Sequence, residues 1–294
     1  MKLAIFLLFF SFTINALDQK PLVVIYPAPQ SEKDTRRPEV KELIKLALEA
    51  TKDTHGPYIL KKSSQYMNIK RQERELKNSK NINIAWFDTT EEKNNKLLPI
   101  EIPMQMGIVG YRVLLVQEKF KKKFEKVSNI EDLRKLKNGL MKSWNNYDIF
   151  NYNNLPIALG NNYEGLFLKL RNGHFDYFSR GLNEAYKELQ DRPSLQKDLV
   201  VDKNISLYYK HYNFLYTSKK NIALNERIKK GLKLIIKNGI FYKVFCKFNR
   251  KYIEQSNLSN RTLIELYNPI IPKSLVLDKS LIFSPKNNIC STKK

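Results

Sequence analysis

Short apolar runs alternate with helix-like stripes along most of this chain, and that alternation restricts its fold more than any other feature. Residues 22–26 predict a strand, and apolar positions at three- and four-residue spacing over residues 40–48 predict a helix. A strand at 58–60, a charged helix at 69–76 and a strand at 82–87 follow. Strands and helices in this order are typical of a parallel sheet covered by helices, so the sequence predicts an α/β fold.

A long apolar strand at residues 109–116 leads into a second alternation. We expect a helix at 130–136, strands at 140–144 and 157–159, a helix at 163–170, a strand at 175–178 and a helix at 182–189. The chain then returns through short strands at 199–201, 207–209 and 214–217 to a helix at 228–236, and residues 286–294 are expected to be disordered. This order indicates a second βα unit inserted into the first.

The first residues have the pattern of a signal peptide. Lys2 precedes an apolar stretch that ends at the small residue Ala16, and the stretch is too short to span a bilayer comfortably. We expect cleavage after Ala16 and export to the periplasm. No Cys follows that point directly, which argues against a lipid anchor, and no later window has the length of a membrane span.

The formal net charge of +23 raises the question of a nucleic-acid partner. The lysines are dispersed, however, and the densest run, at residues 119–123, is flanked by apolar Val116 and Phe124. That pattern favours a solvated lysine face. We therefore expect no nucleic-acid partner, and a positive field that would steer small anions.

Cys246 and Cys290 are the only cysteines, and three histidines are scattered along the chain. No zinc or haem spacing can be assembled from them, so we expect no metal and no cofactor. The two cysteines could pair in an oxidising compartment. Because Cys246 lies in an apolar stretch and Cys290 in a polar tail, we favour one buried thiol and one stray thiol.

Three local motifs point to a family. Residues 81–93 form a strand that leads to Thr90 and, three residues later, Lys93. Residues 166–176 end in Leu-x-Asn-Gly-x-Phe-Asp, and residues 238–242 read Asn-Gly-Ile-Phe-Tyr. In this order they resemble bacterial periplasmic solute-binding proteins of type II, family 3, which serve amino-acid uptake. The resemblance covers nearly the whole mature chain and implies two βα lobes, joined by hinge strands, that close on a small solute.

The chain departs from this family at two positions. The resemblance implies an Arg that grips the α-carboxylate of the solute, but Lys93 stands there and cannot form a bidentate fork. It also implies a second-lobe Asp for the α-ammonium, where this chain has Gly181 beside Arg180. We therefore expect an anionic or aromatic solute instead of an ordinary α-amino acid, or a chain that has lost transport function.

The residues that we select as candidate ligand contacts are Tyr26, Arg36, Trp86, Thr90, Lys93, Arg112, Trp144, Tyr163, Arg180 and Glu184. Each has a structural interpretation beside the functional one. Arg112, inside an apolar strand, needs either a structural ion pair or a ligand. Arg180 and Glu184 have the spacing of an internal pair, and Tyr26 and Trp86 could be core residues.

The sequence thus predicts a solute receptor that is not an enzyme, since it has no Gly-x-Ser-x-Gly, metal or phosphate-loop motif. We expect a monomer that serves an ABC-type permease or a membrane sensor. The alternative is an envelope protein that binds anionic polymer or lipid through its basic surface. The expected organisation is a signal peptide (1–16), lobe 1 (17–113 and 206–272), an inserted lobe 2 (114–205) and a C-terminal tail (273–294).

Overall fold

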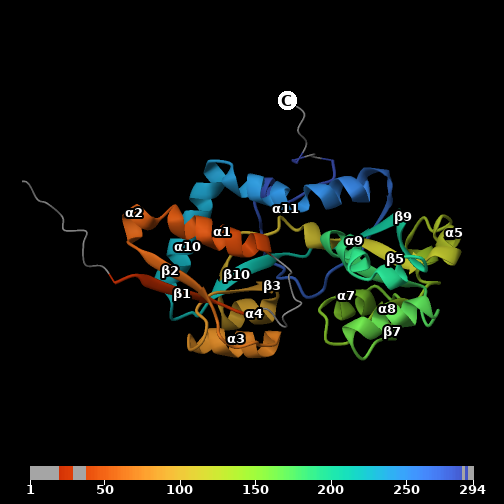
Figure 1. Cartoon of the computed structure of the whole chain (residues 1–294), viewed down its shortest axis with the longest axis horizontal. Helices are drawn as coiled ribbons and strands as arrows, with labels where there is room; N and C mark the ends of the chain where they lie inside the picture. The colour runs from red at the N-terminus through yellow and green to blue at the C-terminus, as the bar shows by residue number, and fades with distance from the viewer. Residues whose placement is uncertain (1–19, 29–37, 287–288, 291–294) are drawn as a thin grey trace, which may run out of the picture.

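A computed structural model describes residues 20–28, 38–286 and 289–290, and in it the chain forms two halves (Figure 1). The first half lies on the left of the view and the second on the right, while α11 (Ile240–Ser256) runs along the top over both. The predicted signal peptide and Arg36 lie outside the described residues.

The first half is built from two parts of the sequence, one before β5 (Tyr111–Gln117) and one after β9 (Leu199–Tyr208). Its strands are β1 (Leu22–Tyr26), β2 (Tyr58–Lys62), β3 (Ala85–Asp88), β4 (Leu98–Ile100) and β10 (Asn213–Thr217). Its helices are α1 (Pro38–Glu49), α2 (Lys52–His55), α3 (Ile69–Asn78), α4 (Glu91–Lys96) and α10 (Ile222–Lys237). β1 pairs with β2 in parallel, as the alternation predicts, but β3 and β4 pair antiparallel with β10.

Asn83, just before β3, links the two small sheets of the first half through backbone and side-chain hydrogen bonds to β1. Asn83 accepts a hydrogen bond from Ile25 N through its Oδ1 at 2.7 Å and donates from its Nδ2 to Val23 O at 2.7 Å. These bonds satisfy backbone groups on the edge of β1 that is not paired with β2. Asn83 thereby aligns β3 with β1.

Helix α1 packs against α10 through its apolar stripe. Leu43 and Leu48 are almost fully buried there, as the periodicity predicts. The contact is close because α10 has a glycine, Gly231, at the crossing, where an added Cβ would lie 2.0 Å from Ala47 O. A larger residue at 231 would push the two helices apart.

The second half is built on a six-stranded mixed sheet with the order β11-β9-β5-β8-β6-β7. Its strands are β5 (Tyr111–Gln117), β6 (Asn138–Leu140), β7 (Ile157–Leu159), β8 (Tyr177–Gly181), β9 (Leu199–Tyr208) and β11 (Thr262–Glu265). Its helices are α5 (Lys121–Phe124), α6 (Ile130–Leu133), α7 (Asn146–Tyr152), α8 (Tyr163–Arg171) and α9 (Leu182–Gln190). Short 3-10 turns are η1 (Ile108–Gly110), η2 (Glu118–Phe120), η3 (Pro193–Leu195), η4 (Leu258–Asn260) and η5 (Lys279–Leu281).

Strands β5 and β9 carry the chain into and out of the second half. They pair antiparallel at the centre of the sheet, and every residue of β5 is buried. The two strands expected at 199–201 and 207–209 belong to one strand, β9, although its pairing with β5 shifts register between Val201 and Ser206, where the polar residues Asp202 and Asn204 lie. The predicted lobe boundaries at 113/114 and 205/206 fall inside these strands and stay predictions.

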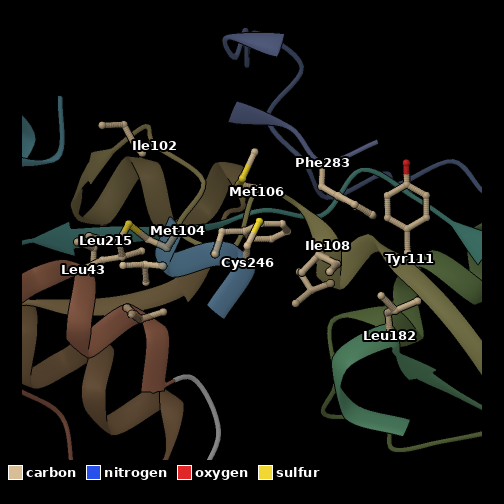
Figure 2. Packing of buried hydrophobic residues seen from close by; sticks show 14 of the residues in the cluster. Leu43, Ile102, Met104, Met106, Ile108, Tyr111, Leu182, Leu215, Cys246 and Phe283 are labelled. Atoms are coloured by element: carbon tan, nitrogen blue, oxygen red, sulfur yellow. The ribbon is translucent and has the colours of Figure 1, made fainter. Parts of the chain in front are cut away.

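The core is continuous between the halves (Figure 2). Leu43 and Leu215 of the first half and Leu182 of the second belong to one buried cluster. Met104, Met106 and Ile108 occupy the middle of that cluster, so the crossing segment before β5 is itself core. Two smaller clusters cover the remaining sheet faces, one in each half.

The C-terminal segment packs back onto this core, and the expectation of two separate thiols is wrong. Phe283 lies between Tyr111 and Phe245, with ring centroids 5.5 and 5.9 Å away, and its N–H donates to Met106 O at 2.7 Å. Cys290 is buried and forms a disulfide with Cys246 of α11, with the two Cα atoms 5.2 Å apart. Residue spacing could not reveal that proximity, because it depends on the tertiary path of the tail.

Other expectations differ at element ends. The strand expected at 140–144 ends at Leu140, since Trp144 enters the turn before α7, and the strand expected at 175–178 begins at Tyr177. Helices α2, α4, α7 and α11 and strands β4 and β11 were not predicted from the sequence. None of the helices in the described ranges has the length and apolar character needed to cross a membrane.

Candidate functional site

Four of the predicted site residues meet in the second half: Trp144, Tyr163, Arg180 and Glu184. Arg180 lies on β8 and is 5 % exposed. Its guanidinium carbon lies 5.1 Å from the Trp144 ring, 5.6 Å from Tyr163 and 5.0 Å from Phe178. We call these three rings the aromatic cage. Their π-faces attract the guanidinium cation, and the rings shield it from water.

Two carboxylates of α9 complete the environment of Arg180. Glu188 accepts from Arg180 Nε at 2.7 Å and from Nη2 at 2.5 Å, and it accepts the Tyr163 hydroxyl at 2.5 Å. Glu184 Oε2 lies 3.2 Å from Arg180 Nη2. Burial opposes the charged guanidinium, but the two carboxylates outweigh it and raise the pKa of Arg180 above its ordinary value. Arg180 is therefore a permanent, paired cation.

Arg112 lies beside this pair on β5 and shares one of its acids. It donates from Nη2 to Ser179 O at 3.1 Å and from Nη1 to Val109 O at 3.4 Å, and Nη1 is 3.8 Å from Glu184 Oε2. Glu184 Oε2 also accepts from Gly181 N at 3.0 Å. These contacts support a structural role for Arg112. Its role as a ligand contact stays a prediction.

The two halves touch through polar side chains that the sequence analysis did not select. Asn145, before α7, donates from Nδ2 to Oδ2 of Asp88 at the end of β3, at 2.8 Å. Asp88 Oδ1 also accepts from Asn213 Nδ2 and lies 3.1 Å from His211 Nε2. We call this set of four residues the junction. Its signal in the sequence is the place of Asp88 at the carboxyl end of a strand, where α/β proteins bind ligands.

Tyr209 lies close to the junction, with its ring centroid 5.9 Å from that of His211, and close to the charged cluster formed by Arg112, Arg180, Glu184 and Glu188. It is 1 % exposed, and its hydroxyl has no hydrogen-bond partner among the described residues. Burial raises its pKa, and the charges of Arg112, Glu184, Asp88 and Arg180 act on it as well. A buried, protonated hydroxyl beside four charged groups can donate to a polar solute.

The remaining predicted residues lie in the first half and have local partners. Thr90 caps α4 by accepting from Lys93 N at 3.2 Å. Lys93 Nζ lies 3.5 Å from Glu73 Oε1 of α3, so its charge is already paired. Tyr26 and Trp86 contact each other with ring centroids 6.3 Å apart. Their roles as ligand contacts stay predictions.

In the described part of the chain, no three His, Cys, Asp or Glu side chains are placed to hold a metal ion. The charged cluster contains two arginines and two glutamates, and the junction adds one aspartate and one histidine. The chemistry of this region is hydrogen bonding and charge pairing on both sides of a boundary between two halves.

Neither the protein-family models nor the curated proteins give a match to this sequence. Solved structures do match. An ancestral arginine-binding protein bound to arginine is 16% identical and has a TM-score of 0.54, and the match covers 78% of this chain and 98% of that chain. The VFT2 domain of BvgS from Bordetella pertussis, crystallised as a double mutant, is 13% identical with a TM-score of 0.55, and covers 77% and 92%.

A third match is ArtJ from Geobacillus stearothermophilus, an arginine-, lysine- and histidine-binding protein. It is 17% identical with a TM-score of 0.51, and the match covers 78% of this chain and 95% of that chain. These matches span almost the full length of each solved chain. The predicted fold class is confirmed: this chain has the two-lobed α/β fold of the periplasmic amino-acid-binding proteins.

Proposed function

We propose that this chain is an exported solute receptor that captures one small polar solute between its two halves and presents it to an ABC-type permease or a membrane sensor. The observation that carries the proposal is the junction, where Asp88 of the first half and Asn145 of the second meet at 2.8 Å on a fold of two lobes. Polar groups on both sides allow a bound solute to make closure favourable. The receptor acts as a monomer and catalyses no reaction.

The solute site in this proposal lies among Asp88, Tyr209, Arg112 and the aromatic cage. Because Arg112 and Arg180 already face Glu184, a solute anion has to compete with that carboxylate. Glu184 is the weaker partner of Arg180, since Glu188 binds the same guanidinium through both oxygens. An anionic group that takes the place of Glu184, or an aromatic group that stacks on the cage, is the solute feature that we propose.

Export has support from the disulfide. Cys246 and Cys290 pair across 44 residues, and such bonds persist in oxidising compartments such as the periplasm. The predicted signal peptide, residues 1–16, would deliver the chain there. Lobe limits at 17–113 with 206–272, and at 114–205, remain part of this proposal.

A thermal-shift screen of residues 17–294 tests the proposal. Amino acids, dicarboxylates, phosphorylated solutes and aromatic solutes are the compounds to compare. A solute at about 100 times its Kd stabilises the native state by about 2.7 kcal/mol. If no compound shifts the transition while heparin-like polyanions bind at low salt only, the envelope-surface alternative replaces solute capture.

A matched pair of variants then places the solute. Tyr209→Phe removes a buried hydroxyl beside the charged cluster, and Tyr177→Phe removes another buried hydroxyl without a described partner, packed against Phe124 at 6.3 Å. We expect Tyr209→Phe to weaken solute binding by about tenfold, the worth of one hydrogen bond, and Tyr177→Phe to leave it unchanged. Equal solute affinities for the two variants would contradict the placement of the solute beside Tyr209.

A further inference from the structure

A groove of about 620 Å³ runs along the outer face of α11, away from the junction. Figure 1 shows α11 lying over both halves, on the side opposite α3 and α8. One face of α11 forms the floor, from Tyr242 to Glu254, and Ile289 of the C-terminal segment forms a wall. The volume lies within the range of protein ligand sites.

The disulfide builds this groove. Cys246 lines it, and its bond to Cys290 fixes Ile289 beside α11. Cys246 Sγ also lies 3.5 Å from Ile289 O. Without that bond the wall has no covalent tie to the helix, and the same residues would form a flat basic surface.

The floor of the groove is strongly basic. Lys243, Lys247, Arg250 and Lys251 line it and are exposed, and Glu254 is the one acid among its described lining residues. Lys247 Nζ is paired with Glu42 at 2.8 Å. Within the described ranges, the other three side chains have no ion-pair partner, in contrast to Arg180 and Lys93, which do.

The spacing of these cations fits an extended chain. Successive positions Lys243, Lys247 and Lys251 lie about 6 Å apart along the helix, at 1.5 Å per residue. Side chains on one face of an extended peptide repeat every two residues, about 6.6 Å. A peptide with carboxylates at alternate positions can therefore place one acid at each cation.

From the basic floor, the apolar wall and this spacing, we propose that the α11 groove is a docking site for an extended acidic segment of a protein partner. The helix face supplies the cations, and Tyr242, Ile289 and the disulfide supply apolar contact for the other side chains. The groove shares no residue with the junction or the aromatic cage. The proposal therefore stands or falls separately from solute capture.

The probe is an eight-residue peptide of alternating Glu and Ser with blocked termini, titrated at low and at physiological ionic strength by fluorescence anisotropy. Lys243→Gln/Lys251→Gln removes two cations from the groove. Cys246→Ser/Cys290→Ser removes the tie to the wall without changing the net charge. Ile289→Asp keeps the disulfide and places in the wall a negative charge, which repels the acidic peptide. This variant tests the wall even if the double Cys variant folds poorly.

The matched control is Lys233→Gln/Lys237→Gln, which removes two cations from the second basic hollow, on α10. We expect each groove variant to weaken peptide binding by about tenfold or more and the α10 control to change it by less than about twofold. An equal loss in the control, or equal binding of a peptide with its four Glu in one block, would overturn the proposal in favour of general charge attraction. Binding of phosphatidylglycerol vesicles that depends on Lys243 and Lys251, with no peptide binding, would overturn it in favour of a membrane surface.

Discussion

Arg227 in the first half and Arg180 in the second half are both buried, but their hydrogen-bond partners differ in charge. Arg227 of α10 donates to neutral acceptors: Thr51 Oγ1 at 3.2 Å, His55 O at 3.0 Å and Gly56 O at 2.7 Å. Its pKa is lowered because burial outweighs the other influences. Arg180 binds carboxylates instead, and its pKa is raised.

The difference separates a structural cation from one that can exchange partners. The partners of Arg227 lie at the two ends of α2, with Thr51 before the helix and His55 and Gly56 at its end, so they cannot leave without unfolding that region. The partners of Arg180 are side chains of α9, which can rotate when a solute enters. Arg180 therefore has partners that a solute can replace, whereas the partners of Arg227 are fixed by the fold.

The largest effect expected from this comparison comes from Arg180→Met. The change leaves Glu184 and Glu188 together in a buried site without their shared cation, and it should lower the free energy of unfolding by about 3–5 kcal/mol. Urea denaturation measures the loss. Adding Glu188→Gln to this variant should restore part of the stability. A loss below about 1 kcal/mol for Arg180→Met alone would show that the ion pairs of Arg180 are exposed to solvent.

Arg227→Met should cost less, about 2 kcal/mol, because the carbonyls of His55 and Gly56 regain water when the guanidinium is removed. The same urea titration applies. Solute affinity of the folded variant should equal that of the wild type, since the hydrogen-bond partners of Arg227 are Thr51, His55 and Gly56 and none of them belongs to the proposed solute site. A change in affinity would contradict its assignment as a structural cation.

Asn145→Ala should lower the unfolding free energy by about 1 kcal/mol, the worth of its hydrogen bond to Asp88. The larger consequence of this substitution is a shift of the conformational equilibrium toward a state in which the two halves are apart. Faster amide hydrogen exchange at β3 and in the segment before α7 would report that shift. Asn151→Ala, an exposed position on the same helix α7, is the control and should change neither quantity. Unchanged exchange in Asn145→Ala would mean that the junction does not hold the halves together.

The smallest effect concerns pH. Burial, and then the nearby charges of Lys230 and Arg227, lower the pKa of His55 below 6.5. The folded state therefore binds fewer protons than the unfolded state near that pH, and the contribution of His55 to stability is lost as the pH falls below about 6.5. An NMR titration should give a midpoint below 6.5 for His55, whereas Arg180 stays charged throughout. A midpoint above 6.5 would contradict the effect of burial and of the charges of Lys230 and Arg227 on His55.

Much of the fold could be predicted from apolar periodicity. The stripe of α1, the buried strand β5 and the order of two βα units follow from residue spacing, because burial of one face is a local pattern. The pairing of Cys246 with Cys290 and the docking of Phe283 on Tyr111 could not, because they depend on where a tail of irregular structure returns.

The candidate site was only partly predictable for the same reason. Arg180 lies near the end of strand β8 and Glu184 lies four residues later in the first turn of α9, so their ion pair could be inferred from spacing alone. The contact of Asp88 with Asn145 joins residues 57 positions apart in two halves, and the place of Tyr209 close to the junction and the charged cluster depends on the antiparallel register of β5 and β9. No local pattern contains that information.

The central claim is that a solute closes the two halves on each other. Spin labels at Lys77→Cys on α3 and Arg171→Cys at the end of α8 report the separation of the halves by double electron–electron resonance, with the native disulfide left intact. With the solute that gives the largest thermal shift, we predict a shorter and narrower distance distribution, and a smaller shortening in Asn145→Ala. A solute that stabilises the protein while leaving the distribution unchanged would contradict the account.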